Sequence, residues 1–276
     1  METSFLKRLY ERNKKSSSSF PDKESASDFI DQLFRFLFLP QLERNQAFTD
    51  IKKEYDSLKS YLSTLVYDVL PDGDKTQTVT ESFFTHLPEV YDRLLNDAAS
   101  IVKHDPAAKS VEEVLVAYPG FYAIAVYRFS HQLYSLGVNM LPRLFTEYAH
   151  GKTGIDIHPG ASIGEGFFID HGTGIVIGET AVIGDHVKIY QGVTIGALLS
   201  INDDHKAKRH PTIEDNVVIY AGATILGAII IGRDSVIGGN VWITSSIPAS
   251  SKVYQKNEIT TIDAAKAKDK IDQFVG

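Results

Sequence analysis

The sequence comprises 276 residues, of which 43% are hydrophobic, and it carries a formal net charge of −7 at pH 7. This length and apolar content suit one large or two ordinary domains with real cores, and the acidic balance argues against a nucleic-acid partner. The chain contains no cysteine, which excludes disulfides, zinc–thiolate sites and a cysteine acyl-enzyme intermediate.

The N-terminal segment 1–19 is charged and then serine-rich, without the apolar core of a secretory signal. Beyond it, apolar residues recur at helical spacing up to about residue 150. Pro40, the turn at 71–74 and Pro88 are expected to end helices, because proline cannot continue the helical hydrogen-bond pattern. Further helices are expected over 90–102 and 121–136. The residues that show the spacing are Ile30, Leu33, Phe34, Leu37, Phe38, Ile51, Tyr55, Leu58, Leu62, Leu65 and Val69.

From residue 155 the spacing of isoleucines changes to six. Helices repeat every 3.6 residues and strands every two, so this period indicates a coil with flat sides of about six residues, stacked through parallel ladders. The best membrane candidate, the uncharged run 217–232, lies inside this pattern and is shorter than the ~20 residues of a membrane helix. The repeating residues are Ile157, Ile163, Ile169, Ile177, Ile183, Ile189, Ile195, Ile213, Ile219, Ile225, Ile231, Ile237 and Ile243.

The chain is therefore expected to be an α+β protein with an all-helical domain over 1–150 and a β-helix over 151–247. A tail follows at 248–276. We expect neither a membrane nor a nucleic-acid partner, and a cytoplasmic location.

Two breaks interrupt the six-residue register. Eight residues separate Ile169 from Ile177, and eighteen separate Ile195 from Ile213. The second break predicts a polar loop at 197–210 that is extruded from the coil. Because loops on rigid scaffolds commonly carry function, and both breaks contain histidine, the chemistry is expected there.

His171 in the first break is the leading candidate for a general base, since a neutral imidazole can take a hydroxyl proton near pH 7. Asp156 lies fifteen residues earlier, about one coil away, where its carboxylate could hold the other imidazole nitrogen. The alternative is an exposed corner histidine without a catalytic role.

The second break ends in a basic run, 206–210, which could meet a carboxylate or a phosphate; charge runs of this kind are also commonly just solvated. The pair His205 and His210 leaves open a metal site on a β-helix, as in the gamma class of carbonic anhydrases.

The run from Asp156 to Thr180 closely resembles the signature region of the serine acetyltransferases. The resemblance continues at Arg209-His210-Pro211, and in the helical half at His104–Ala108, Tyr118–Phe121 and Tyr127-Arg128. It spans roughly residues 90–247.

This resemblance implies a left-handed β-helix of hexapeptide repeats that transfers acetyl from acetyl-CoA to L-serine, the first step of cysteine synthesis from serine. Acetyl-CoA would be a co-substrate, with no permanent cofactor and no metal. Active sites would lie between neighbouring subunits of a homotrimer, and the helical half could pair two trimers. His171 would be the base, oriented by Asp156, and His210 would assist. The residues holding the serine ammonium and carboxylate would be Asp105, Asp170, Arg209 and His210, and those beside CoA would be Ala197, Ala221 and Gly239.

The chain also departs from the family pattern in three places. The residues 198–204 replace a short glycine-rich loop, and 247–253 lack a Gly-x-Pro-Ala continuation. The sequence ends in Phe274-Val275-Gly276 instead of an isoleucine, so no stable complex with O-acetylserine sulfhydrylase is expected. The remaining alternatives are another acceptor, such as homoserine or an amino sugar, a zinc-dependent hydratase, and a catalytically silent scaffold.

Overall fold

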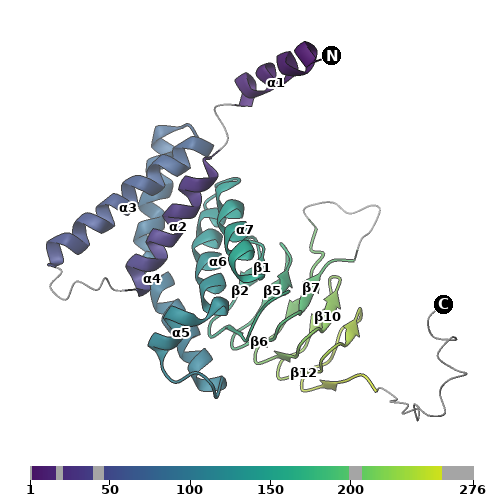
Figure 1. The fold of residues 1–276 in the computed structure, drawn as a ribbon. Coiled ribbons are helices and arrows are strands. Elements are labelled where there is room, and N and C mark those ends of the chain that lie inside the picture. The colour runs from purple at the N-terminus through teal and green to yellow at the C-terminus, as the bar shows by residue number, and fades with distance from the viewer. Residues whose placement is uncertain (1, 17–20, 40–46, 199–206, 257–276) are drawn as a thin grey trace, which may run out of the picture.

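The structure is a computed structural model, and it describes residues 2–16, 21–39, 47–198 and 207–256. Its helical half is followed by a stack of short strands (Figure 1). The first helix, α1, stands apart from the other helices in Figure 1. The helices within the described residues are α1 Glu2–Ser16, α2 Lys23–Phe38, α3 Phe48–Val69, α4 Gly73–His104, α5 Val111–Ala117, α6 Pro119–Ser135 and α7 Leu141–Thr153.

The expected turn at 71–74 is confirmed, because α3 ends at Val69 and Asp72 caps α4 by accepting the Lys75 N–H. The expected break at Pro88 is wrong: Pro88 lies inside α4, which is one continuous helix of 32 residues. Proline cannot bond the carbonyl of Phe84 one turn earlier, and the Tyr55 hydroxyl of α3 donates to that carbonyl at 3.4 Å instead. Pro40 lies outside the described residues.

The C-terminal half is a left-handed parallel β-helix with three faces. Sheet A contains β1 Asp156–Ile157, β4 Val176–Ile177, β7 Thr194–Gly196, β10 Thr224–Leu226 and β13 Trp242–Ile243. Sheet B contains β2 Ser162–Ile163, β5 Val182–Ile183, β8 Thr212–Ile213 and β11 Ile230–Ile231. Sheet C contains β3 Phe168–Ile169, β6 Lys188–Ile189, β9 Val218–Ile219, β12 Val236–Ile237 and β14 Lys252–Val253.

The six-residue isoleucine pattern is confirmed, since each isoleucine of the repeat lies in a strand and is buried. In uninterrupted coils the paired isoleucines are 18 residues apart, as Ile177 and Ile195 are. This number is three sides of six residues, so the isoleucines form three columns that fill the coil. Aliphatic side chains in register along parallel ladders bury a continuous core.

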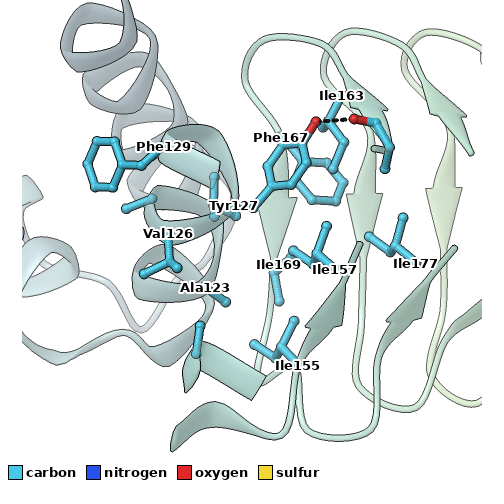
Figure 2. Packing of buried hydrophobic residues seen from close by; sticks show 14 of the residues in the cluster. Ala123, Val126, Tyr127, Phe129, Ile155, Ile157, Ile163, Phe167, Ile169 and Ile177 are labelled. Atoms are coloured by element: carbon cyan, nitrogen blue, oxygen red, sulfur yellow. Dashed lines mark hydrogen bonds between the residues drawn. The ribbon is translucent and has the colours of Figure 1, made fainter. Parts of the chain in front are cut away.

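The helical half closes the first coil, whose open edge would otherwise leave strand carbonyls unpaired. Tyr127 of α6 donates to the Ala161 carbonyl at 2.6 Å, and the His131 ring bonds the Pro159 carbonyl at 2.8 Å. Figure 2 shows Tyr127 pointing from α6 toward the first coil, beside Phe167. Side chains of the helical domain therefore supply hydrogen bonds to these two carbonyls at the edge.

A buried ion pair also joins the two halves. Arg128 of α6 binds both carboxylate oxygens of Asp97 in α4, at 2.6 and 2.9 Å. The same guanidinium donates to the carbonyls of Ile163 and Gly164, and Asp97 accepts the Phe167 N–H. These hydrogen bonds hold the helical half against the first coil of the β-helix, at residues that precede both breaks in the isoleucine register. Within the described residues no helix combines the length and apolarity that crossing a bilayer requires.

Candidate active site

The first break forms a bulge at the corner where the chain passes from sheet C to sheet A. Paired residues across it are 20 apart, as Ile157 and Ile177 are, so two extra residues leave the coil. His171, Gly172 and Gly174 all have positive φ, at 56°, 93° and 82°. This left-handed backbone is uncommon for a non-glycine residue such as histidine, and it leaves the His171 side chain 72% exposed.

Two carboxylates accompany His171 at this corner. Asp170 lies 3.6 Å from the imidazole, and Asp105 follows the last turn of α4. The Tyr118 hydroxyl donates to Asp105 at 2.7 Å. That hydrogen bond, partial burial and the charges of Asp105, Glu113 and Asp170 raise the pKa of Tyr118 to about 12. Asp105 and Asp170 therefore both lie near the Tyr118 hydroxyl, although they are 65 positions apart in the sequence, and His171 follows Asp170 directly.

Asp156 lies at the start of β1 and contacts Arg143 of α7 at 3.8 Å. Glu147 and His150 lie close enough to Asp156 that one ligand atom of each falls within 4.8 Å of the others. No hydrogen bond or ion pair joins Asp156 to His171 among the described residues. An orienting role for Asp156 stays a prediction.

The second break lies at the next corner, between sheets A and B. It separates β7 from β8, and its residues 199–206, including His205, lie outside the described residues. Paired residues across it are 30 apart, as Ile195 and Ile225 are. Arg209 and His210 close the loop against the coil that carries Glu179 and Thr180.

His210 is buried and held in one tautomer by Thr180. The Thr180 N–H and hydroxyl both lie at His210 Nδ1, at 3.1 and 2.8 Å, while Thr180 Oγ1 accepts the N–H groups of Arg209 and His210. Nδ1 is therefore an acceptor, and the proton of the neutral ring sits on Nε2. Burial, followed by the charges of Arg209 and Lys208, lowers the pKa of His210 to about 4.

The His210 ring lies directly over Gly178, where any side chain would collide with it. A Cβ built at Gly178 would be 2.0 Å from His210 Nε2. The neighbouring Arg209 binds the Glu179 carboxylate, which also accepts the Tyr134 hydroxyl at 3.1 Å. Partial burial would raise the pKa of Glu179, but these two hydrogen bonds lower it.

The candidate residues thus form two groups, at the two ends of sheet A. His171, Asp170 and Asp105 lie where the chain enters sheet A, and Arg209 and His210 lie where it leaves. Of the residues expected beside CoA, Ala221 and Gly239 stack at the entry corner, where a Cβ on Gly239 would be 3.0 Å from the Ala221 carbonyl. Ala197 follows β7 at the exit corner.

Sequence reasoning missed Tyr118, Tyr190, Glu179 and Thr180. Tyr190 follows β6 as Asp170 follows β3, so it lies one coil above Asp170, and it stacks on Tyr220 with ring centroids 5.1 Å apart. Counting the ladder across the loop pairs Val182 with Thr212, and the same offset places Thr180 beside His210. The ladder offset could therefore have identified Thr180, and Glu179 before it, as neighbours of His210 and Arg209.

The three-faced β-helix of six-residue repeats places the chain in the hexapeptide-repeat class of proteins. The family model described as "Bacterial transferase hexapeptide (six repeats)" matches residues 210–245.

Among relatives, the plasmid serine acetyltransferase of Synechococcus elongatus is 54% identical over 182 residues, covering 64% of this chain and 57% of that protein. The serine acetyltransferase of Helicobacter pylori is 48% identical over 151 residues, covering 55% of this chain and 86% of that protein. The crystal structure of serine acetyltransferase isoform 3 from Entamoeba histolytica, in complex with cysteine, superposes with a TM-score of 0.78 at 34% identity, covering 85% of this chain and 83% of that one.

The chain therefore belongs to the serine acetyltransferase family. Its match spans a little over half the length of the Synechococcus relative.

Proposed function

We propose that this protein transfers the acetyl group of acetyl-CoA to the hydroxyl of L-serine, giving O-acetyl-L-serine and CoA, as the first step of cysteine synthesis from serine. The observation that carries the proposal is the pairing of the exposed His171 imidazole with Asp170 at one corner of a family β-helix, where Tyr118 holds a second carboxylate, Asp105. The Entamoeba relative holds cysteine, which differs from serine only by sulfur in place of oxygen.

His171 takes the proton of the serine hydroxyl as that oxygen attacks the carbonyl carbon of the thioester. The C–O bond forms, the tetrahedral intermediate collapses, and the C–S bond breaks. The imidazolium then gives its proton to the departing CoA thiolate, so the ring ends the cycle neutral. Because the chain has no cysteine, no acetyl thioester can form on the protein, and the acetyl group passes directly from CoA to serine.

The two charged groups match the two ends of an amino acid. Asp105 and Asp170 would hold the ammonium, and the Arg209 guanidinium with the Nε2–H of neutral His210 would hold the carboxylate. Asp156 would orient His171. Acetyl-CoA would pass the small residues Ala221, Gly239 and Ala197 as a co-substrate, without a permanent cofactor or metal.

We further propose that the complete site forms between chains of a homotrimer, which the helical domain, residues 1–150, could pair into a dimer of trimers. The shared site is supported by the positions of the two charged groups, which lie at opposite ends of the strands of sheet A within one chain. When sheet A of each chain faces a threefold axis, its entry corner adjoins the exit corner of the next chain. Co-assembly of His171→Ala and Arg209→Ala chains would then restore activity that neither variant has alone. Mixtures no more active than the separate variants would contradict the shared site.

The proposed function is tested by thiol release from acetyl-CoA with a panel of acceptors. L-Serine should give the highest kcat/KM, and homoserine and amino sugars should give much lower values. A higher kcat/KM for either alternative would decide against serine. Equal thiol release with and without any acceptor would decide against acetyl transfer altogether.

A further inference from the structure

Tyr118 occupies the junction between α5 and α6, and its hydroxyl reaches across to the end of α4. It is the residue between the two helices, directly after Ala117 of α5 and directly before Pro119, the first residue of α6. Its O–H donates to Asp105 Oδ2 at 2.7 Å, while the backbone N–H of Ala107 donates to Asp105 Oδ1 at 2.8 Å. Both carboxylate oxygens of Asp105 therefore have a fixed donor.

The same junction is tied to the strand that leads to His171. Gly120 packs so closely on β3 that a Cβ there would lie 2.7 Å from the Ile169 carbonyl oxygen. Ile169 is followed directly by Asp170 and His171. The start of α6 thus has a fixed position relative to the bulge, and the Tyr118 hydroxyl transmits that position to the Asp105 carboxylate.

Asp105 needs such support because it lies just beyond the last turn of a 32-residue helix. A carboxylate there is disfavoured by the partial negative charge of the helix C-terminus, and the same charge favours an approaching cation. A donor that stays protonated keeps the carboxylate aimed without neutralising it. The pKa of the Tyr118 hydroxyl, raised to about 12 by its hydrogen bond to Asp105, satisfies this condition at neutral pH.

We propose that Tyr118 is a positioning residue for the amino group of the acceptor: it holds the Asp105 carboxylate toward the His171 corner and thereby selects acceptors that carry an ammonium group. This inference rests on the proposed function and deepens it. Preorganised polar groups held by supporting hydrogen bonds bind their ligand more tightly than mobile ones.

Tyr118→Phe removes the hydroxyl and keeps the ring. Because one charge-assisted hydrogen bond is lost, we expect the KM for L-serine to rise by about 10-fold. The kcat and the KM for acetyl-CoA should stay within about twofold, since His171 and the CoA path are untouched. The preference for L-serine over 3-hydroxypropionate, which lacks the amino group, should fall by about the same factor.

Tyr122→Phe is the matched control. Tyr122 lies in the first turn of α6, and its hydroxyl donates at 2.8 Å to Asp31 of α2, which also accepts hydrogen bonds from Tyr148 and Lys152. This variant loses an equivalent tyrosine–aspartate hydrogen bond and should leave the serine KM and the acceptor preference unchanged.

Two kinetic outcomes overturn the proposal. In one, Tyr118→Phe behaves like Tyr122→Phe. In the other, kcat and both KM values change together with a lower melting temperature, which marks a structural role. A wild-type protein inactive with serine would instead contradict the proposed function. Crystal structures of the two variants then decide the positioning role without activity: a displaced Asp105 carboxylate in Tyr118→Phe supports it, and an unmoved one overturns it.

Discussion

Replacing Arg128 with alanine should weaken the junction between the helical domain and the β-helix. The side chains of Arg128 and Asp97 are 4% and 0% exposed, and the guanidinium bonds both carboxylate oxygens. Among the described residues, its removal leaves the Asp97 carboxylate with the Phe167 N–H at 2.9 Å as its remaining hydrogen-bond donor. The carbonyls of Ile163 and Gly164 also lose donors.

Removing one member of a buried ion pair costs about 3–5 kcal/mol, because the other charge stays buried. At roughly 2–4 °C per kcal/mol for a chain of this size, the melting temperature should fall by about 6–20 °C. Urea unfolding followed by circular dichroism measures the free energy, and an unchanged slope shows that the same surface unfolds.

Arg93→Ala is the control for this experiment. Arg93 faces Glu165 of the same coil at 3.8 Å, with both side chains about half exposed, and exposed pairs contribute about 0–1 kcal/mol. The expected difference between the two variants is therefore at least about 2 kcal/mol. If Arg128→Ala unfolds within 1 kcal/mol of Arg93→Ala, about the value of an exposed pair, the assignment of the ion pair as the clamp of the junction is refuted.

Three further predictions concern the site and the assembly. Gly178→Ala should displace the His210 ring, whose Nε2 would be 2.0 Å from the new Cβ, and lower kcat/KM for L-serine by about 10-fold or more; Gly151→Ala, with open space around it, should not. Burial lowers the pKa of His210 to about 4, whereas in the unfolded chain it is about 6.5. Since the unfolded state then binds the proton more tightly, stability should fall by at most about 3 kcal/mol as pH drops from about 6.5 to 4. His210→Asn should flatten that part of the pH profile, and an equally steep slope would contradict the pKa. The single tryptophan, Trp242, is 69% exposed on sheet A, so trimers built around sheet A should protect its fluorescence from acrylamide; equal quenching of monomer and trimer would place the interface elsewhere.

The fold was predictable because each six-residue side of the coil contributes one buried isoleucine, so the spacing of isoleucines in the sequence equals the length of a side. The two insertions appear as longer spacings between successive isoleucines. Pro88 was not predictable in the same way, because the Tyr55 hydroxyl that accommodates it comes from another helix. Local sequence carries no signal for such a tertiary contact.

The site was predictable only in part, for a similar reason. His171 and His210 lie in the two breaks, and Thr180 could have been found by extending the ladder register to His210. The meeting of Asp105 with Asp170 depends on how α4 and α6 pack against the first coil, which no spacing encodes. Asp156 faces Arg143 within the chain, so its role toward His171 stays a prediction.

The most direct test of the account is the effect of His171→Ala on L-serine-dependent thiol release from acetyl-CoA. The side chain is 72% exposed, so the variant should fold with an unchanged circular dichroism spectrum. Loss of a general base predicts a kcat lower by ~100-fold or more. Near-normal turnover by the folded variant would contradict the assignment of the chemistry to this corner of the β-helix.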